Sequence, residues 1–160
     1  LIMQRIAVRR AATISHLVLC DTAAQIGSPE IWNPRIAAVR ADGIASISDA
    51  ILQRWFAPAT AAGEDFAMWR AMLERTPAEG YAQVCAAIRD ADYTADLARI
   101  AAPTLVMVGA EDSSTPPALV RATADRIAGA RFVVVPEAGH LPCVEQPDAV
   151  AALIRAHLEG

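Results

Sequence analysis

Short segments made almost entirely of apolar residues recur along the chain. The clearest are the ranges 17–20, 104–108 and 132–135, which are followed by aspartate, glycine and proline respectively. A strand that is buried on both faces of a parallel sheet has a continuous apolar run rather than an alternating one. Right-handed crossover connections place such strands side by side. The pattern therefore predicts three strands of one parallel sheet.

Segments with helical periodicity flank these strands. Apolar residues in the range 1–12 share one wide side of a helix, and polar residues occupy the other. Helical patterns also follow the second and third strands, at 117–128 and 147–158. Pro147 and Asp148 suit the first turn of a helix. Alternating strands and helices indicate an α/β fold.

The middle of the chain, from about residue 29 to 92, contains no strand-like run. An all-helical insertion between two parallel strands is typical of a lid over the carboxyl ends of the strands, where open α/β sheets bind ligands. We therefore divide the chain into a core segment at 1–22, a helical lid at 23–98 and a second core segment at 99–160. The lid helices are expected at 29–40, 44–56, 64–75 and 78–90.

Two ionisable residues follow neighbouring strands of the predicted sheet. Asp112 comes after the strand at 104–108, and the pair Gly139-His140 comes after the strand at 132–135. A catalytic serine needs a base within hydrogen-bonding distance, and that base needs an acid that orients it and stabilises the imidazolium. Imidazole, with an ordinary pKa of about 6.5, suits the base role near neutral pH. We predict that His140 is the base of a catalytic triad and that Asp112 is its acid.

Other residues compete for these roles. Glu111 stands beside Asp112, and Asp21 ends the first predicted strand, from which it could reach the same histidine. A lone histidine in a glycine-containing turn is more often structural, but the strand before it and the helix after it favour catalysis here. His16 and His157 lack that context and are expected to be structural.

The nucleophile is not evident in the sequence. The chain contains no G-x-S-x-G segment, which forms the sharp strand-to-helix turn that exposes a catalytic serine. Cys143 is too close to His140 in sequence, and Ser113 and Ser114 belong to an ordinary loop. Because the chain opens on Leu1 and its first helix resembles the middle of a fold, we expect an N-terminal half to be missing. That half is expected to supply the nucleophile, and the isolated chain is expected to aggregate or to need its complement.

The composition argues against nucleic acid and membranes as partners of this chain. Among 160 residues, 14 are basic and 18 are acidic, and the charges are interleaved, so no basic surface for nucleic acid is predicted. Although 54% of the residues are hydrophobic, no apolar run reaches the roughly 18 residues of a membrane span. Cys20, Cys85 and Cys143 form no C-x-x-C pair, so neither a metal site nor a redox site is expected. Reduced thiols fit a cytoplasmic location.

The residues around the predicted acid and histidine resemble those of the α/β-hydrolase superfamily. The similar segments are 103–112 with 115–117, which contain the acid and the residues after it, and 138–147, which contains the histidine. The resemblance covers the whole chain, from the helix after the nucleophile turn to the last helix. It implies the C-terminal part of an α/β-hydrolase fold with a helical lid.

A more specific similarity lies in the segments 19–27, 32–36, 51–56, 79–81 and 85–88. These segments resemble those of the 3-oxoadipate enol-lactonases. That family hydrolyses a small anionic enol-lactone in the β-ketoadipate pathway of bacterial aromatic catabolism, and it needs no cofactor. The resemblance implies that water opens the lactone through an acyl-serine intermediate, with His140 acting as base and then as acid.

An anionic lactone needs a cationic partner in its binding site. Arg35 could clamp the substrate carboxylate through two hydrogen bonds, and Trp32 and Trp55 could form an apolar wall. Each also has a structural alternative, as a solvated helix arginine or as part of the lid core. Trp69 and Arg54 are expected to be structural.

Two other functions remain open. An aspartate at the nucleophile position would make the protein a dehalogenase or an epoxide hydrolase with the same fold. In a non-catalytic binding protein, His140 and Asp112 would be relics of an ancestral enzyme.

Overall fold

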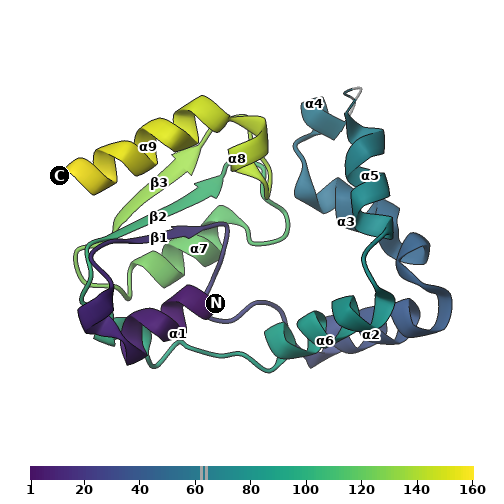
Figure 1. The fold of residues 1–160 in the computed structure, drawn as a ribbon, viewed down its shortest axis with the longest axis horizontal. Coiled ribbons are helices and arrows are strands. Elements are labelled where there is room, and N and C mark those ends of the chain that lie inside the picture. The colour runs from purple at the N-terminus through teal and green to yellow at the C-terminus, as the bar shows by residue number, and fades with distance from the viewer. Residues whose placement is uncertain (62, 64) are drawn as a thin grey trace.

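A three-stranded parallel sheet forms the centre of the larger part of the molecule (Figure 1). The computed structural model describes residues 1–61, 63 and 65–160. The strands are β1 (Leu17–Cys20), β2 (Thr104–Gly109) and β3 (Arg131–Val135), and they lie in the order β1-β2-β3. Both pairings are parallel. The three predicted strands and their arrangement side by side are therefore confirmed.

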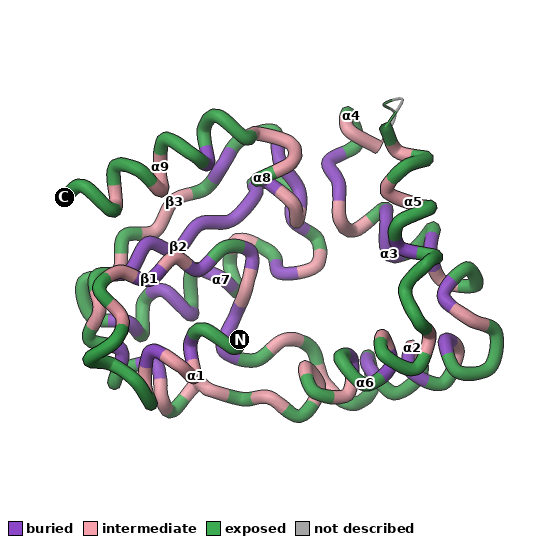
Figure 2. Tube along the Cα trace, viewed as in Figure 1, coloured by how far each residue is buried: buried purple, intermediate pink, exposed green. Residues whose placement is uncertain are grey.

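Helices cover both faces of this sheet. On one face α1 (Ile2–Arg9) and α7 (Pro117–Ala124) pack against β1 and β2, and on the other α9 (Pro147–Glu159) packs against β2 and β3. Every residue of β2 is buried, as Figure 2 shows, because it lies between two helical layers and two strands. This position explains why its sequence is continuously apolar.

A helical lid forms the second part of the molecule, beside the carboxyl ends of the strands (Figure 1). Helices α2 and α6 pack side by side, with Trp32 and Ile36 of α2 against Ala82 and Cys85 of α6. A second apolar cluster joins α3 to α5. The lid helices are α2 (Pro29–Asp42), α3 (Ser48–Trp55), α4 (Pro58–Ala61), α5 (Phe66–Glu74) and α6 (Ala78–Arg89).

Some helix boundaries differ from the expected ones. Helix α2 ends at Asp42 rather than at 40 and is followed by Gly43, whose φ of 74° favours glycine. Helix α7 ends at Ala124 rather than at 128. A short helix, α8 (Pro142–Glu145), follows the predicted histidine and was not expected. The expected helices at 1–12 and 44–56 each divide into an α-helix and a 3₁₀ turn. The 3₁₀ turns are Ala11–Thr13 and Ile44–Ile47. Residue 64, where a helix was expected to begin, lies outside the described residues.

None of the helices in the described ranges is long and apolar enough to cross a bilayer.

Candidate active site

A cavity of about 480 Å³ lies between the lid and the carboxyl ends of the strands. Most of its wall is apolar and comes from lid helices, whereas its polar side comes from the loops after the strands. A mainly apolar cavity with a few convergent polar groups is the usual form of a small-molecule site. Four of the residues predicted from the sequence to form the site line this cavity, namely Trp32, Arg35, Trp55 and His140.

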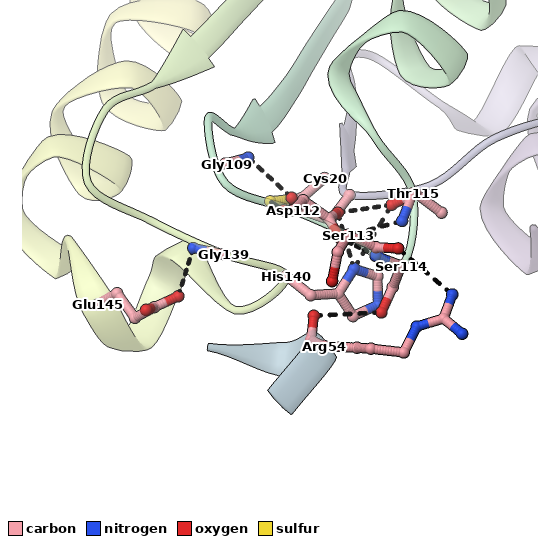
Figure 3. A network of polar contacts seen from close by, with 11 residues as sticks. Cys20, Arg54, Gly109, Asp112, Ser113, Ser114, Thr115, Gly139, His140 and Glu145 are labelled. Carbon is pink, nitrogen blue, oxygen red and sulfur yellow. Dashed lines mark hydrogen bonds and ion pairs between the residues drawn. The ribbon is translucent and has the colours of Figure 1, made fainter. Parts of the chain in front are cut away.

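His140 and Asp112 form a hydrogen-bonded pair at this cavity. Nδ1 of His140 lies 2.9 Å from Oδ2 of Asp112 (Figure 3). The Asp112 side chain also accepts hydrogen bonds from the Thr115 hydroxyl at 2.7 Å and from the backbone N–H groups of Ser114 and Thr115, at 2.7 and 3.0 Å. Asp112 is only 3% exposed, so these partners replace the water that its carboxylate would otherwise bind.

These contacts determine the charge and the orientation of the pair. Burial by itself raises the pKa of Asp112, but the hydrogen bonds from His140 and Thr115 outweigh it and hold this pKa below its ordinary value. An ionised carboxylate can only accept hydrogen bonds, so Nδ1 of His140 carries the proton. Nε2 then has a free lone pair and can take a proton from a hydroxyl group.

Asp21, the alternative partner of the histidine, forms hydrogen bonds with other groups. Its side chain accepts a hydrogen bond from the Gly109 N–H at 2.9 Å and one from the Cys20 thiol at 2.8 Å. Burial raises the pKa of Asp21 to about 7 despite these hydrogen bonds. Asp21, Asp112 and His140 each place one possible metal ligand within 4.8 Å of the others. Both carboxylates already accept hydrogen bonds from neighbouring groups, which compete with their use as metal ligands.

The loops after β2 and β3 approach each other at two glycines. A Cβ atom at Gly109 would lie 2.0 Å from the carbonyl oxygen of Gly139 and 2.4 Å from that of Ala138. Only glycine permits this approach of two backbones. The close contact brings the acid loop and the histidine loop together. The backbone N–H of Glu111 donates a 2.9 Å hydrogen bond to the Ala138 carbonyl there, but the Glu111 residue is exposed.

We expect Gly109→Ala to lower the free energy of unfolding by about 1–3 kcal/mol or more, because the added methyl group would overlap two backbone carbonyls. Chemical denaturation of the variant and the wild type measures this change. The matched control is Gly80→Ala in α6, where a Cβ has room at 4.0 Å from the nearest atom and should be neutral or stabilising. Equal stability of the two variants would contradict the steric argument.

The aromatic residues expected at the site contact it in different ways. Trp32 is nearly buried, and its Nε1 donates a hydrogen bond of 2.6 Å to the carbonyl of Ile26. The guanidinium of Arg35 lies over the Trp32 ring, 4.9 Å from its centre. Trp55 is half-buried, and its carbonyl accepts a 2.8 Å hydrogen bond from the backbone N–H of His140. The structure thus places these three residues and His140 around one cavity.

Several cavity residues were not expected from the sequence. Arg54, expected to be structural, lines the cavity, and its Nη2 donates a long hydrogen bond of 3.3 Å to the Ser113 carbonyl. Tyr81 also lines the cavity, where burial raises its pKa. Trp69 packs against Phe56 inside the lid, as expected. Arg54 and Trp55 are adjacent in sequence, and sequence pattern alone does not show that both face the cavity.

The two remaining histidines lie against each other, with ring centres 5.3 Å apart and nearly perpendicular planes. Neither His16 nor His157 lines the cavity.

Known proteins share this sequence pattern and fold. A model of the alpha/beta hydrolase family matches residues 2–153. The chain is 32% identical over 155 residues to 3-oxoadipate enol-lactonase 2 of Acinetobacter baylyi, and the match covers 96% of this chain and 58% of that protein.

Two solved structures are similar as well. The enol-lactonase from Burkholderia xenovorans superposes with a TM-score of 0.93 at 38% identity, over 98% of this chain and 61% of that one. A thermophilic esterase from Thermogutta terrifontis, solved with malate bound, superposes with a TM-score of 0.81 at 35% identity, over 91% and 56%. The chain therefore spans 56–61% of the length of these relatives.

Proposed function

Because this chain belongs to the α/β-hydrolase family, we propose that it is part of a serine hydrolase that acts on small carboxylic esters or lactones. In this proposal His140 is the general base and Asp112 is the residue that orients it. The observation that carries the proposal is the 2.9 Å contact between Nδ1 of His140 and Oδ2 of Asp112 at the cavity wall. The curated enol-lactonase and the esterase described above are hydrolases, which supports the same reaction class.

We propose that the serine comes from sequence outside these 160 residues. The nucleophile turn of such folds connects a strand to the N-terminus of a helix. Here the N-terminus of α1 lies beside the end of β1, since the backbone nitrogen of Leu1 is 3.4 Å from the Thr22 hydroxyl oxygen. Gln4 holds the same end in place through a 3.2 Å hydrogen bond to the Ala23 carbonyl. A turn that precedes α1 would therefore reach the side of the cavity where Asp21 lies.

The proposed steps of ester hydrolysis start from a His140 ring that carries its proton on Nδ1. Nε2 of His140 takes the proton of the serine hydroxyl as its oxygen attacks the carbonyl carbon of the substrate. Collapse of the tetrahedral intermediate breaks the ester bond, and the imidazolium returns the proton to the leaving oxygen. Water repeats the sequence on the acyl-serine. The buried, ionised Asp112 stabilises the imidazolium in both halves of the reaction.

The charges in the cavity support a substrate that carries a carboxylate. Arg35 and Arg54 both line the cavity, and neither forms an ion pair within the described part of the chain. The similar esterase was solved with malate, a dicarboxylate, and two relatives are enol-lactonases. We propose 3-oxoadipate enol-lactone as the substrate, with its carboxylate on Arg35 and its ring between Trp32 and Trp55.

We expect Arg35→Ala, in the full-length protein, to raise KM for an anionic lactone by roughly 10- to 100-fold, the effect of losing a charge-assisted hydrogen bond. KM for an uncharged ester of similar size should change little. Steady-state kinetics on the two substrates measures the difference. Arg40→Ala is the control, because Arg40 lies on the same helix but pairs with Glu79 outside the cavity. Equal losses on both substrates would remove Arg35 from the site.

A fluorophosphonate probe tests the reaction class directly, since it reacts with an activated serine. The full-length protein should be labelled and should lose labelling on His140→Ala. A full-length protein that turns over haloalkanes or epoxides without being labelled would have an aspartate nucleophile instead. Absence of both labelling and turnover would support a non-catalytic binding protein.

A further inference from the structure

The lid and the histidine loop are joined by a carboxylate that the catalytic mechanism does not use. Glu145, at the end of α8, accepts a 2.8 Å hydrogen bond from the backbone N–H of Ala57 on Oε1. Its other oxygen, Oε2, accepts a 2.7 Å hydrogen bond from the backbone N–H of Gly139 (Figure 3). Ala57 belongs to the lid, and Gly139 directly precedes His140. One side chain thus spans two segments that are 82 residues apart in the sequence.

The two segments also touch directly. The backbone N–H of His140 donates a 2.8 Å hydrogen bond to the carbonyl of Trp55. A Cβ atom at Gly139 would lie 2.8 Å from both the Ala57 nitrogen and the Trp55 oxygen, so the backbones are in van der Waals contact. A shift of either segment is therefore passed to the other.

The acid loop is attached to the same part of the lid. The hydroxyl of Ser114 donates a 3.3 Å hydrogen bond to the carbonyl of Arg54, and the Arg54 guanidinium donates to the carbonyl of Ser113 (Figure 3). Ser114 in turn holds Asp112 through its backbone N–H. The end of α3 consequently contacts the loops of both residues of the pair.

We propose that Glu145 is a positioning residue that clamps the lid segment 55–57 to the histidine loop 138–140 and so keeps the ring of His140, the carboxylate of Asp112 and the cavity wall at Trp55 in one fixed geometry. The role in catalysis rests on the proposed function of His140. The clamp needs both oxygens, because each serves a different backbone N–H group. The lid is therefore attached at this point and does not swing freely over the cavity.

The chemistry of the clamp predicts a graded response to substitution. Glu145→Gln keeps one acceptor oxygen but turns an amide NH₂ group toward a backbone donor, so one of the two bonds is lost. Glu145→Ala removes both acceptors. Since a misplacement of about 1 Å can cost roughly 100-fold in rate, we expect kcat to fall about 100-fold in Glu145→Ala and less in Glu145→Gln. KM should change much less than kcat.

The test uses the full-length protein, with the concentration of active molecules determined by fluorophosphonate titration. The matched control is Glu137→Gln, which removes a carboxylate from the same loop. Glu137 is exposed, and only its backbone carbonyl takes part in a hydrogen bond of the described residues, with Gln146. We expect this variant to retain the wild-type kcat. In Glu145→Ala, the backbone amides of Ala57, Gly139 and His140 should exchange with deuterium faster than in the control.

Three results would overturn the inference. The first is a kcat of Glu145→Ala, per titrated active site, equal to that of Glu137→Gln. The second is a fall in melting temperature with unchanged kcat, which would make Glu145 merely structural. The third is unchanged exchange of the three amides, which would show that Glu145 does not hold the segments together. A wild type that does not react with the probe would instead refute the proposed function, and the exchange measurement would still decide whether the clamp exists.

Discussion

Replacing His140 with alanine is expected to lower kcat of the full-length protein by roughly 10⁴- to 10⁶-fold, the usual effect of removing the base of a hydrolytic triad. Without the imidazole, the group that takes the proton of the nucleophile in the proposed mechanism is gone. Asp112 cannot replace it, because its carboxylate is buried and fully hydrogen-bonded. Single-turnover and steady-state rates on a small ester measure the loss.

His157→Ala is the matched control for this substitution. His157 packs against His16 and lies outside the cavity, so its loss should leave kcat unchanged. A His140→Ala variant that retains the wild-type kcat would show that this histidine is not the base. The protein would then be a non-catalytic member of its family or would rely on another group.

Replacing Asp112 with asparagine is expected to lower kcat by roughly 10⁴-fold with little change in the fold. The physical reason is the position of one proton. Asparagine can turn its NH₂ group toward Nδ1 of His140, which favours the tautomer with the proton on Nε2. That tautomer has no lone pair facing the cavity. The imidazolium formed during the reaction would also lose its charged partner, the buried carboxylate of Asp112.

Two neighbouring carboxylates provide the controls. Glu111→Gln alters the residue before Asp112, but the Glu111 side chain is exposed, and kcat should remain unchanged. Asp21→Asn tests the residue that lies within 4.8 Å of the pair and bonds to Gly109. We expect its effect on kcat to be much smaller than that of Asp112→Asn. The reverse order would assign the orienting role to Asp21.

The sequence did not determine whether Asp21 or Asp112 contacts His140. Both aspartates follow strands of the same parallel sheet, so both were expected at the same edge. Their contacts differ because the Asp21 side chain turns to the backbone of Gly109, whereas Asp112 sits in a loop that directs its carboxylate to His140. Side-chain direction at the end of a strand depends on the path of the next few residues, which apolar periodicity does not reveal.

Glu145 is a second residue whose contacts could not be predicted from the sequence pattern. An acidic residue in a short loop is ordinarily solvated, and no local pattern singled it out. Its two hydrogen-bond donors come from Ala57, 88 residues earlier, and from Gly139. The short helix α8, which places it there, is also too brief to have a recognisable periodicity.

The order of buried strands, the helical layers around them and the positions of an acid and a histidine at the ends of adjacent strands were readable in the linear chain. They follow from local rules, because a strand buried on both faces must be apolar throughout and parallel strands end at one edge. The convergence of Arg35, Arg54 and Trp55 on the cavity came from the packing of the lid. It depends on how side chains of different helices fit together, as Trp32 and Ile36 do against Ala82 and Cys85. Such contacts join residues that are distant in sequence, and no single segment encodes them.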